Sequence, residues 1–219
     1  AVRAATRGDT DTIIEGAPGS GKTTTLKPIK EAWEAAGYRV IGSATAWKIA
    51  NMLRDDLGIE ARATDSWLAK AAAHQPFLDA KTVLVLDEAG LLSSRQMHAV
   101  LSAFRSVARD GAAPKLVLVG DRDQLQAVGA GSGLRLVADA VEAQRVEAIQ
   151  RQREPWLRDA ILALGRGEAE VGLKAFSDRG HVRHLQDRGS TIKALVDRWE
   201  EATSAPPEKS TLMIAATNA

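Results

Sequence analysis

Short apolar runs alternate with amphipathic stretches along the first 150 residues of the chain. Residues 83–86 are apolar at every position, which is typical of strands that are covered on both faces of a sheet. This alternation predicts an α/β fold with a parallel sheet flanked by helices. We expect strands at residues 12–15, 39–42, 82–86, 115–119 and 146–149, and helices at residues 22–35, 47–56, 66–73 and 95–108.

The pattern changes after residue 149, where a polar and basic segment precedes Pro155, a residue that can start a helix. We therefore expect one domain at residues 1–150 and the truncated start of a second α/β domain at residues 151–219. Because the chain begins with Ala1 and closes on a strand-like run, we interpret it as a piece of a longer protein. Beyond residue 150 the pattern predicts helices at residues 155–164, 168–176 and 191–202 and strands at residues 182–185 and 212–216.

The composition excludes several classes of protein. Hydrophobic residues make up 45% of the chain and charged residues 26%, which excludes a disordered, collagen-like or coiled-coil chain. Because 29 basic residues balance 28 acidic ones, any basic surface for nucleic acid has to be local. The chain has no cysteine, which excludes disulfides and thiol nucleophiles, and its apolar runs are too short to span a membrane. We expect a cytoplasmic protein.

A glycine-rich segment after the first expected strand has the pattern of a phosphate-binding loop. Residues 16–23 read GAPGSGKT, in which two glycines flank four residues and precede Lys and Thr. Glycines let backbone N–H groups turn towards phosphate oxygens, and the start of the following helix adds its positive end. A glycine-rich turn that binds nothing is the alternative, which the strand and helix on either side disfavour. Lys22 can reach the β- and γ-phosphates, the Thr23 hydroxyl can bind Mg²⁺, and Gly16, Gly19, Ser20 and Gly21 complete the candidate site.

Two adjacent carboxylates, Asp87 and Glu88, follow the apolar run at residues 83–86. The carboxyl end of a buried parallel strand is where such sheets bind ligands. Asp87 could hold Mg²⁺ through water, and Glu88 could polarise an attacking water molecule, which would make the site hydrolytic. The alternative is a strand that simply ends in solvated charge. The phosphate-binding pattern elsewhere in the chain favours the catalytic interpretation.

A neutral amide, Gln124, follows the expected strand at residues 115–119 at the same edge of the sheet. An amide in this place can touch both a γ-phosphate and the attacking water, and so report on hydrolysis. It could equally be an exposed side chain in a helix that Asp121 caps. The spacing alone leaves both readings open.

Together these segments resemble the successive motifs of superfamily 1 DNA helicases. The resemblance rests on residues 16–24, 87–90 and 120–131, in this order, and is strongest to RecD-like motors that move 5′ to 3′. Residues 43–53 are similar to a further motif of that series, and residues 149–152 to the motif that opens the second motor domain. Within the family, residues 152–160 look most like the helicase part of TraA-type conjugative relaxases.

The resemblance implies a RecA-like P-loop fold, ATP and Mg²⁺ as cofactors, and single-stranded DNA as partner. It adds Thr24 to the nucleotide site, couples Gln124 to DNA, and gives Arg151 the role of an arginine finger. It also implies that the chain works within a larger relaxase or helicase polypeptide, with other transfer proteins as further candidate partners. Thr45 would contact the DNA backbone, and Thr64, Ser66 and Trp67 lie where the family has another DNA-contacting segment. Trp67 could stack on bases, although a tryptophan in an alanine-rich helix is more often part of the core.

The chain departs from the family pattern at both ends. Residues 1–11 contain no glutamine that could read adenine, so the preference for ATP rests on the resemblance alone. The later motifs of the second motor domain would lie beyond residue 219. We therefore expect this chain to bind nucleotide, hydrolyse it slowly and unwind no duplex by itself. The alternatives are a RecD-like recombination or repair helicase, a P-loop kinase of a small metabolite, and a passive nucleotide-sensitive DNA-binding module.

Overall fold

The computed structural model describes residues 2–6, 11–16, 22–75, 77–108, 112–121, 130–141, 143–146, 154–204 and 214. The chain forms two compact units, Ala1–Gly172 and Leu173–Ala219, which are described separately. The domain boundary predicted at residue 150 falls within residues 147–153, outside the described part of the chain, and it stays a prediction.

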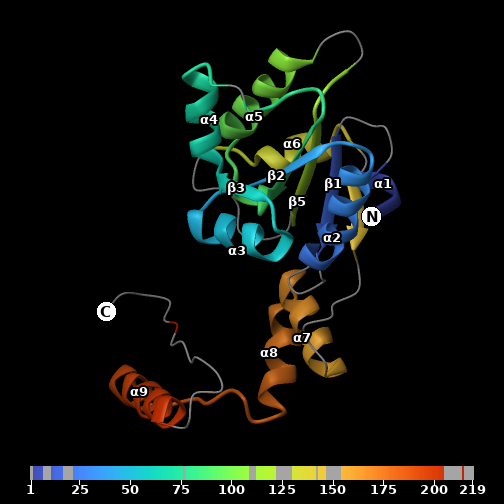
Figure 1. Ribbon diagram of the computed structural model, residues 1–219. Helices are drawn as coiled ribbons and strands as arrows, with labels where there is room; N and C mark the ends of the chain where they lie inside the picture. The colour runs from blue at the N-terminus through green and yellow to red at the C-terminus, as the bar shows by residue number, and fades with distance from the viewer. Residues whose placement is uncertain are drawn as a thin grey trace. The chain divides into compact units, whose positions relative to one another are not determined.

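The first unit is built on a parallel sheet whose strands follow the order β3-β2-β4-β5-β1-β6 (Figure 1). Every pairing between neighbouring strands is parallel, so all the carboxyl ends lie at one edge of the sheet. The strands are β1 (Asp11–Gly16), β2 (Arg39–Ala44), β3 (Glu60–Ala63), β4 (Thr82–Asp87), β5 (Lys115–Gly120) and β6 (Ala143–Val146).

Helices follow most strands and cover the sheet. The helices that lie wholly within the first unit are α1 (Val2–Ala5), α2 (Lys22–Ala35), α3 (Trp47–Leu57), α4 (Thr64–Ala72), the 3₁₀-helix η1 (Ala89–Leu91), α5 (Ser94–Val107), α6 (Gly133–Ala138) and α7 (Pro155–Gly165), of which α1 to α6 pack on the sheet. Helix α8 (Ala169–Ser177) runs from the first unit into the second, and α9 (Arg188–Ser204) belongs to the second unit.

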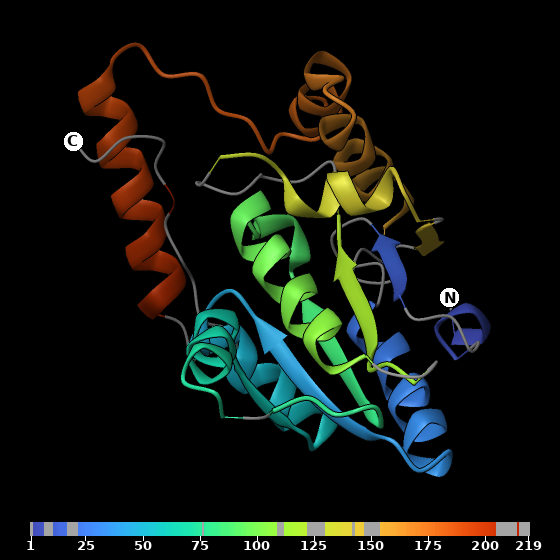
Figure 2. The ribbon, with the colours of Figure 1, turned by 90° about the horizontal axis from the view of Figure 1, so that it is seen from above.

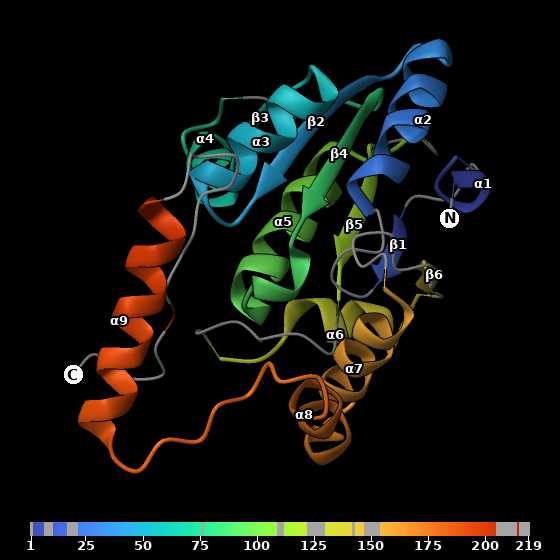
Figure 3. The same ribbon diagram turned by 90° about the horizontal axis from the view of Figure 1, so that it is seen from below.

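The two faces of the sheet carry different apolar residues. In β4 and β5 the leucines (Leu84, Leu86, Leu116 and Leu118) pack with α4, α5 and α6, and the valines (Val83, Val85, Val117 and Val119) pack with α1, α2 and α3. Helix α5 accordingly lies in front of β4 in Figure 2 and behind it in Figure 3. Burial of each such side chain stabilises the fold by roughly 1.5–3 kcal/mol. The two apolar layers explain why these strands are apolar at every position.

The α/β prediction is confirmed, with differences at three strands. Strand β6 begins three residues earlier than the range predicted for it. Strand β3, which reads EARA, was not predicted. Its alternating buried positions are held by alanines, which are too small to give a strong apolar signal. The strand predicted at residues 182–185 is wrong, since this segment has no regular structure. Apart from residue 214, the strand predicted at residues 212–216 lies outside the described residues.

The amino end of β1 carries a carboxylate whose ionisation opposes folding. Burial raises the pKa of Asp11 above its ordinary value, and the positive charge of Lys115 partly counters that shift. The folded protein therefore holds this proton more tightly than the unfolded chain, and the free energy of unfolding falls as pH rises above the ordinary aspartate pKa. We expect Asp11→Asn to raise the melting temperature at pH 7 and to remove part of this pH dependence.

Thermal denaturation between pH 3 and pH 7 tests this expectation. Asp187→Asn is the control, and we expect it to lower the melting temperature at pH 7 instead of raising it. The backbone N–H and hydroxyl of Ser190 donate hydrogen bonds to Asp187 and lower the pKa of its carboxyl. Its contribution to stability is therefore present above the ordinary aspartate pKa and is lost as pH falls. A melting temperature for Asp11→Asn at pH 7 equal to or below that of the parent would contradict the assignment.

Candidate functional site

The strand ends bring segments that are distant in sequence to one edge of the sheet (Figure 3). Glu15 of β1 pairs in register with Gly120 of β5, and Asp87 of β4 pairs with Ala44 of β2. Because β5 lies between β1 and β4, the ends of these three strands are neighbours. Ligands of open parallel sheets bind outside such carboxyl ends. This edge is therefore the candidate functional site.

The predicted phosphate-binding segment begins and ends at this edge. Gly16 closes β1, and Lys22 opens α2, whose first turn contains no acidic residue. The positive end of a 14-residue helix is thus directed at this edge without a neighbouring negative side chain. Residues 17–21, including Gly19, Ser20 and Gly21, lie outside the described residues, and so do the side chains of Lys22 and Thr23. The phosphate-binding role of residues 16–24 stays a prediction.

The turn after β4 holds Asp87 and Glu88 at the same edge. Asp87 Oδ1 accepts a hydrogen bond of 2.9 Å from the backbone N–H of Glu88, and both residues are half-buried. Glu88 has φ 53° and ψ 39°, a left-handed conformation that is uncommon for a residue with a side chain. Such backbone strain costs on the order of 1–3 kcal/mol and concentrates at functional sites. The geometry thus favours a functional role for this turn.

A close approach of two backbones connects this turn to the end of β5. A Cβ atom on Gly120 would lie 3.1 Å from Gly90 N and 2.8 Å from Leu134 Cδ2. A Cβ atom on Gly90 would lie 3.0 Å from the carbonyl oxygen of Asp121. Only glycines leave room for this contact, which joins the Asp87–Glu88 turn to the segment leading to Gln124. The sequence analysis gave these two glycines no positioning role, although Gly120 closes β5 and Gly90 lies two residues after Glu88.

Gln124 and Arg151 lie outside the described residues, so both readings of Gln124 and the finger role of Arg151 stay predictions. Among the described residues there is no group of three or more His, Cys, Asp or Glu side chains that could hold a metal ion. A magnesium ion at this edge would depend on one or two protein oxygens and on substrate phosphates, which is how Mg²⁺ is usually bound. The Asp87 carboxylate is an oxygen ligand of the required kind.

The start of α5 connects the candidate site to α4. Ser93 and Gln96 form a capping box, and Ser93 makes an antiparallel bridge with Ser132. Gln96 Nε2 also donates a 3.0 Å hydrogen bond to Asp65 Oδ1 in the first turn of α4. A line of polar contacts therefore runs from the segment before α6 to the segment in which the sequence predicted DNA contacts.

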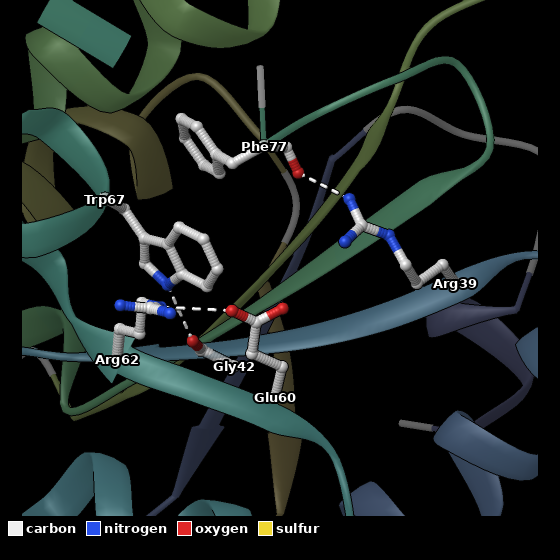
Figure 4. A network of polar contacts seen from close by, with 6 residues as sticks. All are labelled: Arg39, Gly42, Glu60, Arg62, Trp67 and Phe77. Carbon is white, nitrogen blue, oxygen red and sulfur yellow. Dashed lines mark hydrogen bonds and ion pairs between the residues drawn. The ribbon is translucent and has the colours of Figure 1, made fainter. Parts of the chain in front are cut away.

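Trp67 belongs to the core, so the prediction that it contacts DNA is wrong. Its side chain is 2% exposed, and Nε1–H donates a 2.9 Å hydrogen bond to the carbonyl of Gly42 (Figure 4). Its ring stacks on Phe77 with centroids 4.9 Å apart and an interplanar angle of 19°. Arg62 and Lys70 lie 5.4 Å and 5.3 Å from the ring centroid. The indole has no face left for a base.

The DNA contact predicted for Thr64 is also wrong. Thr64 is 2% exposed, and its hydroxyl donates a 3.1 Å hydrogen bond to the carbonyl of Ala44 and lies 2.9 Å from the Ser43 hydroxyl. These contacts hold the carboxyl ends of β2 and β3 together. Ser66 and Thr45 are half-buried and remain candidates. Of the predicted DNA-contacting residues, the structure therefore removes the two that are buried.

Comparisons with known proteins agree with this architecture. The chain matches the AAA domain family over residues 1–187. It is 41% identical over 202 residues to a probable conjugal transfer protein TraA of Sinorhizobium fredii, covering 92% of this chain and 18% of that protein. It is 30% identical over 144 residues to the ATP-dependent RecD2 DNA helicase of Deinococcus radiodurans, covering 64% of this chain and 19% of the helicase.

Among solved structures, the fold is that of the Pif1 helicase from Bacteroides in complex with ADP-AlF3 and single-stranded DNA. The TM-score is 0.55 at 16% sequence identity, over 89% of this chain and 54% of that chain. The RecA-like P-loop fold that the resemblance implied is thereby confirmed. None of the described helices is long and apolar enough to cross a membrane.

Proposed function

The chain belongs to the AAA domain family, and from this membership we propose that it is the ATP-driven motor part of a conjugative DNA-transfer relaxase. The resemblance to TraA-type proteins is confirmed by the 41% identity to the relative from Sinorhizobium fredii. The chain spans 18% of that relative's length, so the proposed activity is that of a larger polypeptide. In the proposed larger polypeptide that contains this chain, ATP hydrolysis would drive 5′ to 3′ movement along single-stranded DNA.

One observation carries the proposal: the ends of β1, β4 and β5 bring Gly16, the Asp87–Glu88 turn and Gly120 to one edge of the sheet. Backbone N–H groups of residues 16–21 and the start of α2 hold the phosphates, and Lys22 neutralises the β- and γ-phosphates. Thr24 adds a hydroxyl in the first turn of α2. Thr23 and Asp87 would hold a magnesium ion, which would add positive charge beside the same phosphates.

Glu88 distinguishes a hydrolase from the alternative small-metabolite kinase. A second carboxylate beside the magnesium-binding Asp87 can accept a proton from water as it attacks the γ-phosphate. Gln124 would position that water, and Arg151 would stabilise the charge that develops on the transferred phosphoryl group. A kinase has to keep water away from this place, so Glu88 speaks against that alternative. The site works in the cytoplasm, where ATP and the transferred strand are both present.

Binding of a fluorescent ATP analogue tests the nucleotide site. We expect the parent chain to bind the analogue in the presence of Mg²⁺ and Lys22→Ala to bind it on the order of tenfold or more weakly, since a charged partner of the phosphates is lost. Lys27→Ala, which removes an exposed lysine further along α2, serves as the matched control and should keep the parent affinity. Equal binding by the parent and Lys22→Ala would contradict the proposed site.

A further inference from the structure

Trp47 is the first residue of α3, two positions after the half-buried Thr45 at the end of β2. Its side chain is 53% exposed. Side chains of an α-helix tilt towards its N-terminus. Because α3 begins three residues after Ala44 closes β2, its N-terminus lies at the carboxyl edge of the sheet, and this tilt favours an indole that extends beyond that edge. Trp47 therefore lies at the candidate site, within the segment of residues 43–53 that resembles a helicase motif, although that resemblance gave the tryptophan itself no role.

The exposure of Trp47 contrasts with that of the other aromatic residues. Among the described residues of the first unit, every other Trp, Tyr or Phe is buried or half-buried. A large aromatic ring usually contributes to the core, as Trp67 does. A single exposed apolar residue is ordinary on a protein surface, so exposure alone would carry little weight. Its place at the ligand-binding edge makes it informative.

The surroundings of Trp47 suit a nucleic-acid strand. Lys48 follows it and is exposed, so the first turn of α3 carries a positive charge towards solvent. The residue before it, Ala46, makes no side-chain hydrogen bond to the first turn of α3, and that turn contains no acidic residue. By contrast, the first turn of α4 carries the acidic Asp65, which is unfavourable to a phosphate. Charge and capping thus favour the start of α3 over the start of α4 as the path of the strand.

We propose that Trp47 is the aromatic platform on which a base of the bound single-stranded DNA stacks, in place of the buried Trp67. This inference rests on the proposed function, because it names a residue that holds the DNA substrate of the same site. The indole offers its ring to the face of a base while Thr45 and Lys48 contact the neighbouring backbone. Because every base has a π-face, such stacking is tolerant of sequence, as a translocating motor requires.

Two readouts on a labelled oligonucleotide of thymidines test the proposal: fluorescence anisotropy and tryptophan emission. We expect Trp47→Ala to bind this strand roughly 5- to 100-fold more weakly than the parent. Trp47→Phe keeps an aromatic face and should stay within about threefold of the parent. Addition of the strand should quench the emission of the parent, and this quenching should be absent in Trp47→Phe.

Met52→Ala is the matched control, because Met52 lies on the same helix and is 56% exposed. Its affinity for DNA should equal that of the parent, and all variants should bind the fluorescent ATP analogue as the parent does. If Trp47→Ala bound DNA as tightly as the parent, and its DNA binding still depended on nucleotide, the proposed role of Trp47 would be wrong. The proposed function would then still stand. A parent chain that binds nucleotide but no single strand would overturn the proposed function and this inference together.

Discussion

Glu88→Gln is expected to stop ATP hydrolysis and to leave ATP binding intact. The amide is as large as the carboxylate but cannot accept the proton of the attacking water, and general-base catalysis contributes about 10²- to 10⁴-fold. Glutamine tolerates the left-handed backbone of this turn as well as glutamate does, so the fold should be unchanged. Single-turnover hydrolysis, with the chain in excess over radiolabelled ATP, measures this effect even where steady-state turnover is slow.

Glu60→Gln is the matched control for this experiment. Glu60 lies in β3 at the edge of the sheet, where its carboxylate pairs with Arg62 at 3.0 Å. This variant should hydrolyse ATP at the parent rate. Hydrolysis by Glu88→Gln within a few-fold of the parent would show that Glu88 is not the base, and the turn after β4 would then be a structural feature only.

Trp67→Ala is expected to lower the free energy of unfolding by about 3–5 kcal/mol. The substitution removes a fully enclosed indole and leaves a cavity between α4 and the sheet. It also takes away the hydrogen-bond donor of the Gly42 carbonyl and the stacking partner of Phe77. Urea denaturation followed by circular dichroism measures this change. A variant that is already unfolded without urea would show a destabilisation larger than expected, with the same sign.

The same substitution at Trp47 provides the control, because the residue types match and only the burial differs. Trp47→Ala removes an exposed ring and should change the free energy of unfolding by no more than about 0.5 kcal/mol. If the two variants unfolded at the same urea concentration, the assignment of Trp67 to the core and of Trp47 to the surface would be wrong.

The strands that the sequence predicted best are those with one apolar layer on each side. Val83 and Leu84 face opposite layers, so β4 is apolar throughout and stands out in the sequence. Strand β3 has no such signal, because its glutamate and arginine are charged and its two buried residues are small alanines. Its position follows from pairing with β2, a long-range contact that local pattern does not contain.

The candidate site could be predicted from sequence where a motif lies at the end of a strand. Gly16 and Asp87 lie at strand ends, as their motifs require, and parallel pairing brings them to one edge. The sequence pattern did not show that Trp67 is buried and Trp47 is exposed. Trp67 follows the turn that begins α4 and packs on Phe77, while Trp47 begins a helix whose apolar face is formed by later residues. Burial depends on how each helix packs on the sheet, which composition does not reveal.

A motor of this kind requires that ATP binding and DNA binding affect each other. The phosphates would lie at the ends of β1 and β4, and the strand of DNA at the start of α3, after β2. Strands β2 and β4 are direct neighbours, with Ala44 opposite Asp87, so the two proposed sites lie about one strand spacing apart. If nucleotide changes the affinity for DNA, DNA has to change the affinity for nucleotide by the same factor.

The most direct measurement is fluorescence anisotropy of a labelled single-stranded oligonucleotide titrated with this chain. The titration is run with and without Mg²⁺ and a non-hydrolysable ATP analogue, and in parallel with Lys22→Ala. We expect a DNA affinity that shifts with nucleotide in the parent and stays constant in Lys22→Ala. The same DNA affinity with and without nucleotide, in a parent chain that demonstrably binds the nucleotide, would contradict it.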